Sequence, residues 1–241
     1  MKNILITGIS KGLGLVLARS LVNLNYNIFG INRTNTDELN CLMNEYPEKI
    51  KIFNYDLSDS DNARNLLLGT FIPIETPLHG FINNAAVAYD DIITNIRIEP
   101  LENMFRVNVF TPFILTKYII RNMLFHKTTG SIIHISSISA HTGYKGLGMY
   151  ASTKAALEAF SKTTAREWGS KGIRSNRIVA GFMDTAMSSK LSPEQKDRIY
   201  KRTSLQNPTK MESVAETAVF LLSDKSESIT GQNVFVDSGT I

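Results

Sequence analysis

The chain has 241 residues, of which 43% are hydrophobic and 20% are charged, a composition typical of one large α/β domain. Its single cysteine excludes an intrachain disulfide and fits a reducing compartment, and its net charge of +4 comes from scattered basic residues, which argues against nucleic acid. No stretch approaches the roughly 18 apolar residues of a membrane span, and the N-terminal apolar run is too short for a signal peptide, so we expect a cytoplasmic domain of enzyme size.

Short apolar runs alternate with longer amphipathic stretches along the chain. Several runs are apolar nearly throughout, as expected of parallel strands that are covered on both faces. This alternation predicts a single α/β domain, with a doubly wound seven-stranded parallel sheet, right-handed crossovers and helices on both faces. The expected strands are 3–7, 26–32, 51–56, 79–85, 130–136, 173–180 and 232–237, and the expected helices are approximately 12–24, 36–46, 59–69, 100–126, 150–169 and 211–223.

A polar segment, 184–208, separates the sixth predicted strand from the last helix. An insert at the carboxyl edge of a parallel sheet is a natural position for a substrate lid. A solvated surface excursion would explain the same composition equally well, and the sequence leaves both interpretations open.

A glycine-rich turn, TGISKGLG at 7–14, joins the first strand to the first helix. Gly8 permits a tight turn, Gly12 lets the backbone approach a pyrophosphate, and Gly14 lets the helix pack close to the strand. The free N–H groups and the positive dipole end of the helix would then face the phosphates. The position of the turn predicts a Rossmann-type dinucleotide site. Its expected residues are Gly8, Ser10, Lys11, Gly12, Leu13 and Gly14.

The end of the second strand indicates which dinucleotide binds. In the usual NAD site an acidic residue there binds the ribose 2′-OH, but this strand ends with Asn32 and Arg33. Arg33 can bind a 2′-phosphate bidentately, and Lys11 could add a second positive charge. The alternative is that both are solvated surface cations. The residues favour NADP(H) over NAD(H).

Further motifs follow the glycine turn in a specific order. They are DL (56–57), NNAA (83–86), Asn108, Ser137, YASTK (150–154), AGFMDT (180–185) and the ending SITGQNVFVDSG (228–239). Together with the turn they resemble the short-chain dehydrogenase/reductase family over the whole chain, and most of all its bacterial β-ketoacyl-acyl-carrier-protein reductases. Any one motif is weak, but the set in register is specific.

The resemblance implies a catalytic tetrad of Asn108, Ser137, Tyr150 and Lys154. Tyr150 would be the acid/base, and Ser137 has the family's usual spacing of 13 residues before it, which distinguishes it from Ser136. Lys154 would bind the nicotinamide ribose and stabilise the phenolate, which would lower the pKa of Tyr150 from ~10 towards ~7. Ser137 would donate to the substrate carbonyl oxygen, and Asn108 would hold a water of the proton path.

The same motifs imply six further cofactor contacts: Asp56, Leu57, Asn83, Ala85, Met183 and Thr185. The first pair would flank the adenine, and the second pair would support the central strand and the adenosine ribose. Of the last pair, Thr185 would contact the carboxamide or pyrophosphate, with Met183 as its backbone neighbour.

The resemblance implies an NADPH-dependent carbonyl reductase, with a β-ketoacyl thioester as the first expected substrate. A ketoreductase of a secondary-metabolite or sugar pathway fits the same residues. So does a non-catalytic NADP-binding sensor, which the intact tetrad disfavours, or an oxidative NAD dehydrogenase, which Arg33 disfavours. The resemblance leaves acyl carrier protein open as a partner. The family carries basic residues at two positions near the site entrance, and here Lys171 is basic but Ser131 is uncharged.

Two further features complete the sequence interpretation. The four histidines lack ligand spacing, so no metal site is expected, and His134 is expected to be buried and hydrogen-bonded within an apolar strand. The helices that contain Asn108 and Tyr150 have broad apolar faces, and the resemblance implies that they pack in a homotetramer or homodimer.

Overall fold

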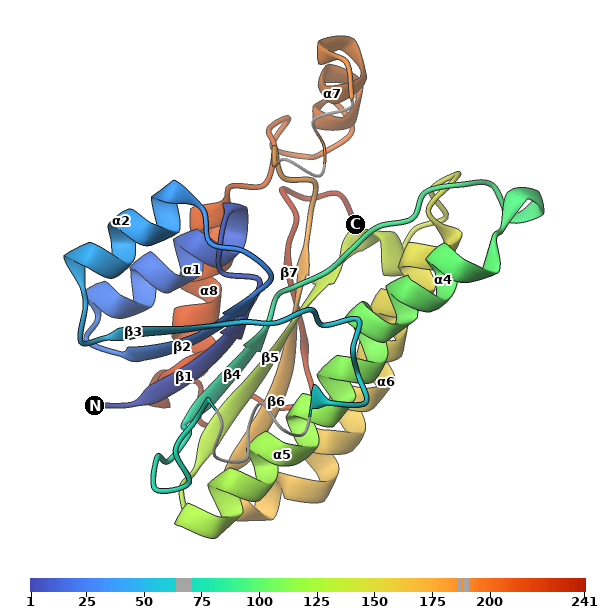
Figure 1. The fold of residues 1–241 in the computed structure, drawn as a ribbon. Coiled ribbons are helices and arrows are strands. Elements are labelled where there is room, and N and C mark those ends of the chain that lie inside the picture. Colours follow the sequence, from blue (N-terminus) through green and yellow to red (C-terminus); the bar gives the residue numbers. More distant parts are fainter. Residues whose placement is uncertain (64–70, 186–187, 189–190) are drawn as a thin grey trace.

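Seven strands form one parallel sheet in the order β3-β2-β1-β4-β5-β6-β7 (Figure 1). The computed structural model describes residues 1–63, 71–185, 188 and 191–241. The strands are β1 (Asn3–Thr7), β2 (Asn27–Asn32), β3 (Ile50–Asn54), β4 (Gly80–Asn83), β5 (Gly130–Ser137), β6 (Ile173–Ala180) and β7 (Asn233–Val236). Every pairing between neighbouring strands is parallel, as the alternation of strands and helices predicts.

Helices cover both faces of the sheet (Figure 1). On one face lie α1 (Gly12–Asn23), α2 (Asp37–Glu45) and α8 (Met211–Leu222), and on the other lie α4 (Ile98–Phe105), α5 (Thr111–His126) and α6 (Gly148–Trp168). Among the residues described, no helix is long and apolar enough to cross a membrane.

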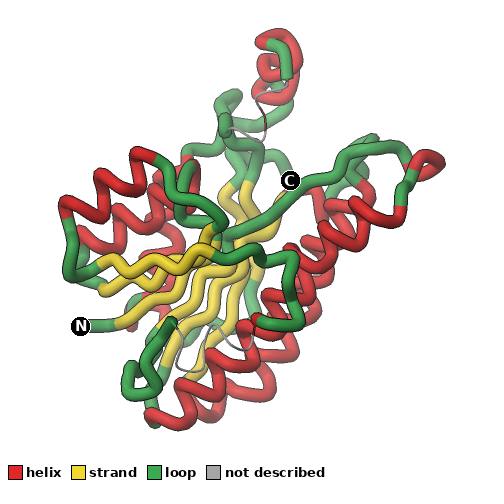
Figure 2. Tube along the Cα trace, in the orientation of Figure 1, coloured by secondary structure: helices red, strands yellow, loops and turns green. Residues whose placement is uncertain are grey.

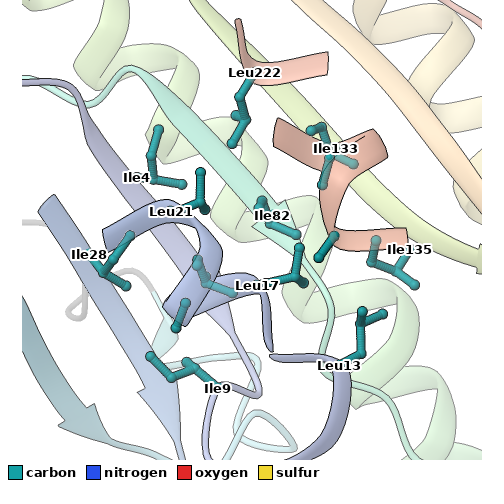
Figure 3. Packing of buried hydrophobic residues seen from close by; sticks show 14 of the residues in the cluster. Ile4, Ile9, Leu13, Leu17, Leu21, Ile28, Ile82, Ile133, Ile135 and Leu222 are labelled. Atoms are coloured by element: carbon teal, nitrogen blue, oxygen red, sulfur yellow. The ribbon is translucent and has the colours of Figure 1, made fainter. Parts of the chain in front are cut away.

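Alternate residues of each central strand serve two separate cores. In β1, Ile4 and Ile6 pack with α1 and α8, whereas Leu5 packs with α5. Figure 3 shows side chains of the first core meeting from α1, β1, β4, β5 and α8. Burial on both faces explains why these strands are apolar nearly throughout.

Most predicted boundaries agree with the structure, and β1 and β6 have the predicted ends. The helix predicted at 100–126 begins earlier, at Ile98, and is interrupted by one π-helical stretch, η3 (Arg106–Phe110). A π-helical turn carries an extra residue, which a continuous amphipathic pattern does not reveal. Residues 64–69 of the predicted helix 59–69 lie outside the described residues.

The polar segment 184–208 contains a short helix, α7 (Pro193–Tyr200), which stands apart from the sheet in Figure 1. The helix begins with a capping box, in which Ser192 and Gln195 bind each other's backbone N–H groups. Residues 186–187 and 189–190 of the segment lie outside the described residues.

The strand order reverses between β1 and β4, because the chain winds outward to β3 before it crosses to β4. Ligands of open α/β sheets bind at the carboxyl ends of the strands at such a switch point. The loops that follow β1, β4, β5 and β6 gather at this edge (green in Figure 2). The predicted site residues come from the carboxyl ends of β1 to β6 with the loops that follow them, and from α1, η3 and α6.

Candidate active site

The glycine turn has a backbone that only glycine accommodates easily. Gly8 and Gly12 have φ values of +73° and +56°. A Cβ on Gly14 would lie 1.9 Å from the carbonyl oxygen of Gly8, so helix α1 packs directly against the turn. Around Gly12 a Cβ would meet nothing within 4 Å, which leaves the outer side of the turn open.

Helix α1 starts at this turn without a side-chain cap. Its N-cap residue, Lys11, makes no side-chain hydrogen bond to the first turn of the helix. The first N–H groups of a helix need partners, and together with the helix dipole they form an anion-binding end. Ser10 contributes its carbonyl to a 2.5 Å bond from Thr36 Oγ1, which ties the turn to the start of α2. Leu13 is buried in the first core.

Asn84 holds the glycine turn in place, a role that the sequence interpretation did not assign. Its Nδ2 donates to the carbonyls of Thr7 and Gly8, both at 3.0 Å. The backbone N–H groups of Asn84 and Ala85 both donate to Thr7 Oγ1 at 3.1 Å. The predicted residue Ala85 therefore braces the turn through its backbone. The sequence signal for this role was the doubled asparagine, Asn83-Asn84, at the end of β4, the strand that pairs with β1.

Asn83 points to the other side, into the sheet. Its Oδ1 accepts from Thr7 Oγ1 at 3.5 Å, and its Nδ2 lies 3.3 Å from His134 Nδ1. His134 is fully buried, and no described atom bonds to its Nε2. Burial, then the charges of Arg177 and Lys154, lower the pKa of His134 to about 3. The expected hydrogen-bonded histidine is therefore right for one ring nitrogen and wrong for the other.

The turn after β2 presents Arg33 at the surface. Asn32 is buried and its Nδ2 donates to Thr34 O and Asn35 Oδ1, both at 3.0 Å. Asn54 of β3 donates to Arg33 O at 3.3 Å, so both sides of the turn are held. Neither Arg33 nor Lys11 pairs with a carboxylate in the described part of the chain, and both are exposed.

Asp56 and Leu57 follow β3 at the same edge. Asp56 Oδ1 accepts from Ser58 N at 2.9 Å, which fixes the carboxylate at the start of this loop. Leu57 is buried in the second core, and its carbonyl accepts from Thr111 Oγ1 at 2.6 Å. The side chain of Leu57 is therefore mainly a core group, so an adenine would meet chiefly its backbone.

Tyr150 and Lys154 lie one turn apart near the start of α6. The Lys154 ammonium is buried, donates to the carbonyl of Ile135 in β5 at 2.8 Å, and lies 5.6 Å from the centre of the Tyr150 ring. Ser137 ends the same strand two residues after Ile135, and its Oγ accepts from Ser139 N at 3.2 Å and from Ser139 Oγ at 3.0 Å. Its own hydroxyl hydrogen is left to donate elsewhere.

Asn108 fastens this part of the site to the loop after β4. From the π-helix η3 its Oδ1 accepts from Val87 N, and its Nδ2 donates to Val87 O, both at 2.9 Å. The second Nδ2 hydrogen goes to Thr153 Oγ1 at 3.1 Å, and Thr153 in turn donates to Tyr150 O at 2.7 Å. Because both amide hydrogens are used, the side chain braces helix α6 and could bind a water only as an acceptor.

Burial is the main cause of the pKa shifts of Tyr150 and Lys154. It raises the pKa of Tyr150 to about 12, with a smaller contribution from the charge of Asp90, and lowers the pKa of Lys154 to about 8. The predicted fall of the Tyr150 pKa towards ~7 is therefore wrong for this structure. The Lys154 ammonium donates one hydrogen bond to Ile135 O, and the loss of water around Tyr150 outweighs its attraction for a phenolate.

The segment after β6 holds the last two predicted contacts. Ser188 Oγ donates to Met183 O at 3.2 Å and accepts from Thr185 N at 3.0 Å, so the two residues belong to one tight turn. Next to it, Lys196 of α7 binds Asp184 Oδ1 at 2.7 Å. This ion pair connects α7 to the edge of the sheet.

Comparisons with known proteins agree with the arrangement. A family described as enoyl-(acyl carrier protein) reductase matches residues 8–240. Carbonyl reductase (NADPH) 2 of Sus scrofa is 32% identical over 237 residues, which are 98% of this chain and 94% of that protein. The 3-oxoacyl-(acyl-carrier-protein) reductase FabG of Rickettsia conorii is 30% identical over 100% of this chain and 97% of its own length.

A solved structure shows the same fold. It is a gluconate 5-dehydrogenase from Burkholderia cenocepacia J2315 in complex with NADP and tartrate, with a TM-score of 0.91 and 25% identity over 99% of this chain and 94% of that chain.

Proposed function

Because this chain belongs to the short-chain dehydrogenase/reductase family, an oxidoreductase family, we propose that it is an NADPH-dependent carbonyl reductase. One observation carries the proposal. Tyr150 and a buried Lys154 lie on one face of α6, and Lys154 binds β5 two residues before Ser137, which has a hydroxyl hydrogen to donate. This is the set of groups that carbonyl reduction requires.

The residues at the switch point fit an NADP(H) molecule. The open outer side of the turn at Gly12, the uncapped N–H groups of α1 and the exposed cations Arg33 and Lys11 suit the phosphates. Asp56, Leu57, Asn83, Ala85, Met183 and Thr185 are proposed to complete this site. When bound, the nicotinamide would supply the hydride that reduces the carbonyl carbon. The pig carbonyl reductase, whose name specifies NADPH, supports the choice of dinucleotide.

The protein's own groups handle the proton. As the carbonyl carbon accepts the hydride and its two electrons, negative charge develops on the carbonyl oxygen. Ser137 Oγ donates a hydrogen bond to that oxygen, and Tyr150 Oη transfers its proton to it, which gives the alcohol. The raised pKa of Tyr150 keeps the phenol protonated and ready to donate at neutral pH. The phenolate that remains stands beside the Lys154 ammonium until it is reprotonated.

A β-ketoacyl thioester is the first proposed substrate, supported by the relatedness to the Rickettsia reductase. A sugar-derived ketone is the second, supported by the fold shared with the gluconate dehydrogenase. Acyl carrier protein would meet Lys171 at the surface but not Ser131, which is buried and donates to Leu221 O. The proposal therefore names the thioester chain and does not depend on the carrier.

A second copy of the chain is proposed to cover the outer face of α4 and η3. Phe110 is 49% exposed there, and its ring centre lies 6.4 Å from that of Phe105. We expect Phe110→Ser to shift the sedimentation coefficient towards that of a smaller assembly. An unchanged coefficient would remove this face from the proposed interface.

The testing experiment follows NADPH oxidation with an acetoacetyl thioester, with NADH in a parallel reaction. Turnover with NADPH, and much less with NADH, is the expected result. Absence of turnover with acetoacetyl thioesters would remove the thioester proposal, and a panel of sugar ketones then tests the second substrate. Tight NADPH binding without turnover of any ketone would contradict the reductase and favour a sensor.

A further inference from the structure

The loop between β4 and α4 exposes an unusual amount of apolar surface. We call residues 89–98, which end with the first residue of α4, the isoleucine loop, because Ile92, Ile93, Ile96 and Ile98 are 43%, 76%, 38% and 66% exposed. Single exposed apolar residues need no explanation, but four exposed isoleucines within seven positions concentrate apolar surface on one segment. Such a surface points to a ligand or a partner.

The loop has a defined shape set by its own side chains. Tyr89 Oη donates to Asn95 O at 3.2 Å and accepts from Arg97 N at 3.1 Å. Asp91 Oδ1 accepts from Ile92 N at 2.8 Å and from Asn95 Nδ2 at 3.2 Å. These bonds close the loop on itself, so the isoleucines are presented on a fixed surface.

The loop is also attached to the catalytic helix. Asp91 N donates to Gly146 O at 3.0 Å, just before α6 begins. Ile93 Cγ1 lies 3.9 Å from where a Cβ of Gly148 would be, and Gly148 is two residues before Tyr150. Figure 1 shows the loop beside the chain that enters α6. Ile93 therefore lies beside the first residue of the helix that carries Tyr150.

Aliphatic side chains offer a ligand neither a hydrogen bond nor a charge. A polar or charged substituent would therefore lose its water at this surface without gaining a partner. An uncharged, apolar substituent would instead pack against the isoleucines and remove them from water.

We propose that Ile93, supported by Ile92, is a specificity-determining residue that selects ketones with a neutral, apolar chain over sugar acids and other polar ketones. The inference rests on the proposed carbonyl reductase and names its substrate class. The occupant of the isoleucine loop is the acyl chain of the substrate. The attachment of the loop to Gly146 and Gly148, where the chain enters the helix that carries Tyr150, favours this occupant over a second copy of the protein.

The test measures binding apart from turnover. The ligands are uncharged 3-oxoacyl thioesters of N-acetylcysteamine with four, six and eight acyl carbons, titrated calorimetrically into the Tyr150→Phe variant saturated with NADPH. Full burial of a methylene strengthens binding about fourfold, so a one-sided apolar wall should give about twofold per methylene. Ile93→Ser should remove most of this dependence on chain length. Ile74→Ser is the matched control, because Ile74 is 61% exposed and lies before β4, at the opposite end of that strand from the site.

The outcomes separate this inference from the proposed function. A chain-length dependence in Tyr150→Phe without ketone turnover by the natural protein would overturn the reductase and keep the apolar site. Turnover with equal affinity for all three chains, or a dependence that Ile93→Ser leaves intact, would overturn the role of Ile93 and keep the reductase. A lower sedimentation coefficient for Ile93→Ser alone would show that a second copy covers the loop, and would also overturn the inference.

Discussion

The glycine turn after β1 and the isoleucine loop after β4 lie at the same edge of the sheet but are built in opposite ways. The turn depends on absent side chains, since a Cβ at Gly14 would collide with Gly8 O, and it offers backbone N–H groups. The loop depends on the side chains of Tyr89 and Asp91, and it offers isoleucines. A backbone site suits a ligand that the whole family shares, whereas a side-chain site can differ from one protein to the next.

The largest expected effect stops the reaction and leaves the glycine turn intact. Tyr150→Phe removes the proton donor, and positioned acids contribute about 10²–10⁴-fold, so kcat should fall by about that factor. NADPH affinity, measured by fluorescence titration, should stay within about twofold, because the glycine turn is not touched. Tyr46→Phe, at the end of α2, is the control and should keep full activity. Normal turnover by Tyr150→Phe would assign the proton to another group.

The next largest effect comes from disrupting the glycine turn itself. Gly14→Ala places a methyl group 1.9 Å from Gly8 O, and backbone on both sides cannot yield without displacing the turn. We expect a loss of about 3 kcal/mol in the free energy of unfolding in urea, at the upper end of the usual cost of overpacking. Gly12→Ala meets no atom within 4 Å and should cost about 1–2 kcal/mol, from its φ of +56° alone. Equal losses would mean that conformation, not contact, sets the glycine requirement.

The glycine turn and the substrate side of the site also differ in how far the sequence predicted them. The strand β1 and the turn after it follow from local rules, because a strand buried on both faces is apolar throughout and a positive φ favours glycine. The role of Asn84 does not, since its bonds reach back 77 residues to Thr7. The fold and the cofactor turn were therefore predictable, and the brace that holds the turn was not.

On the substrate side the sequence predicted where the proposed catalytic residues lie but not their ionisation. Spacing predicted that Tyr150 and Lys154 share a helix face, and they do. The direction of the Tyr150 pKa was wrong, because it depends on how much water tertiary packing removes, and no spacing reports that. The isoleucine loop was missed for a related reason, since its shape comes from bonds among Tyr89, Asp91 and Asn95 in a segment without periodicity.

A pH measurement sharpens the contrast between the glycine turn and the substrate side, because the substrate side contains the buried ammonium of Lys154. Its pKa falls from the ordinary 10.5 to about 8 on folding, so between these pH values the unfolded chain binds more protons. The stability contributed by this group therefore rises with pH from about 8 to about 10.5, by roughly 3 kcal/mol. Lys154→Met should lack that rise. The free energy of unfolding of the variant minus that of the natural protein should therefore fall by the same amount over this window. A difference that is constant with pH would show that the ammonium keeps its ordinary pKa.

The smallest expected effect concerns the rim of the cofactor half. Arg33 is exposed and pairs with no carboxylate in the described part of the chain, so it is available to a 2′-phosphate and is partly screened by solvent. Arg33→Asp should weaken NADPH about tenfold and leave NADH within about twofold, which two parallel titrations compare. Arg202→Asp, a reversal of another exposed arginine beyond α7, controls for net charge and should change neither. Equal weakening of both nucleotides by Arg33→Asp would place the arginine on the adenosine common to them. The turn after β2 would then bind both cofactors without choosing between them, and the preference would have to arise at Lys11.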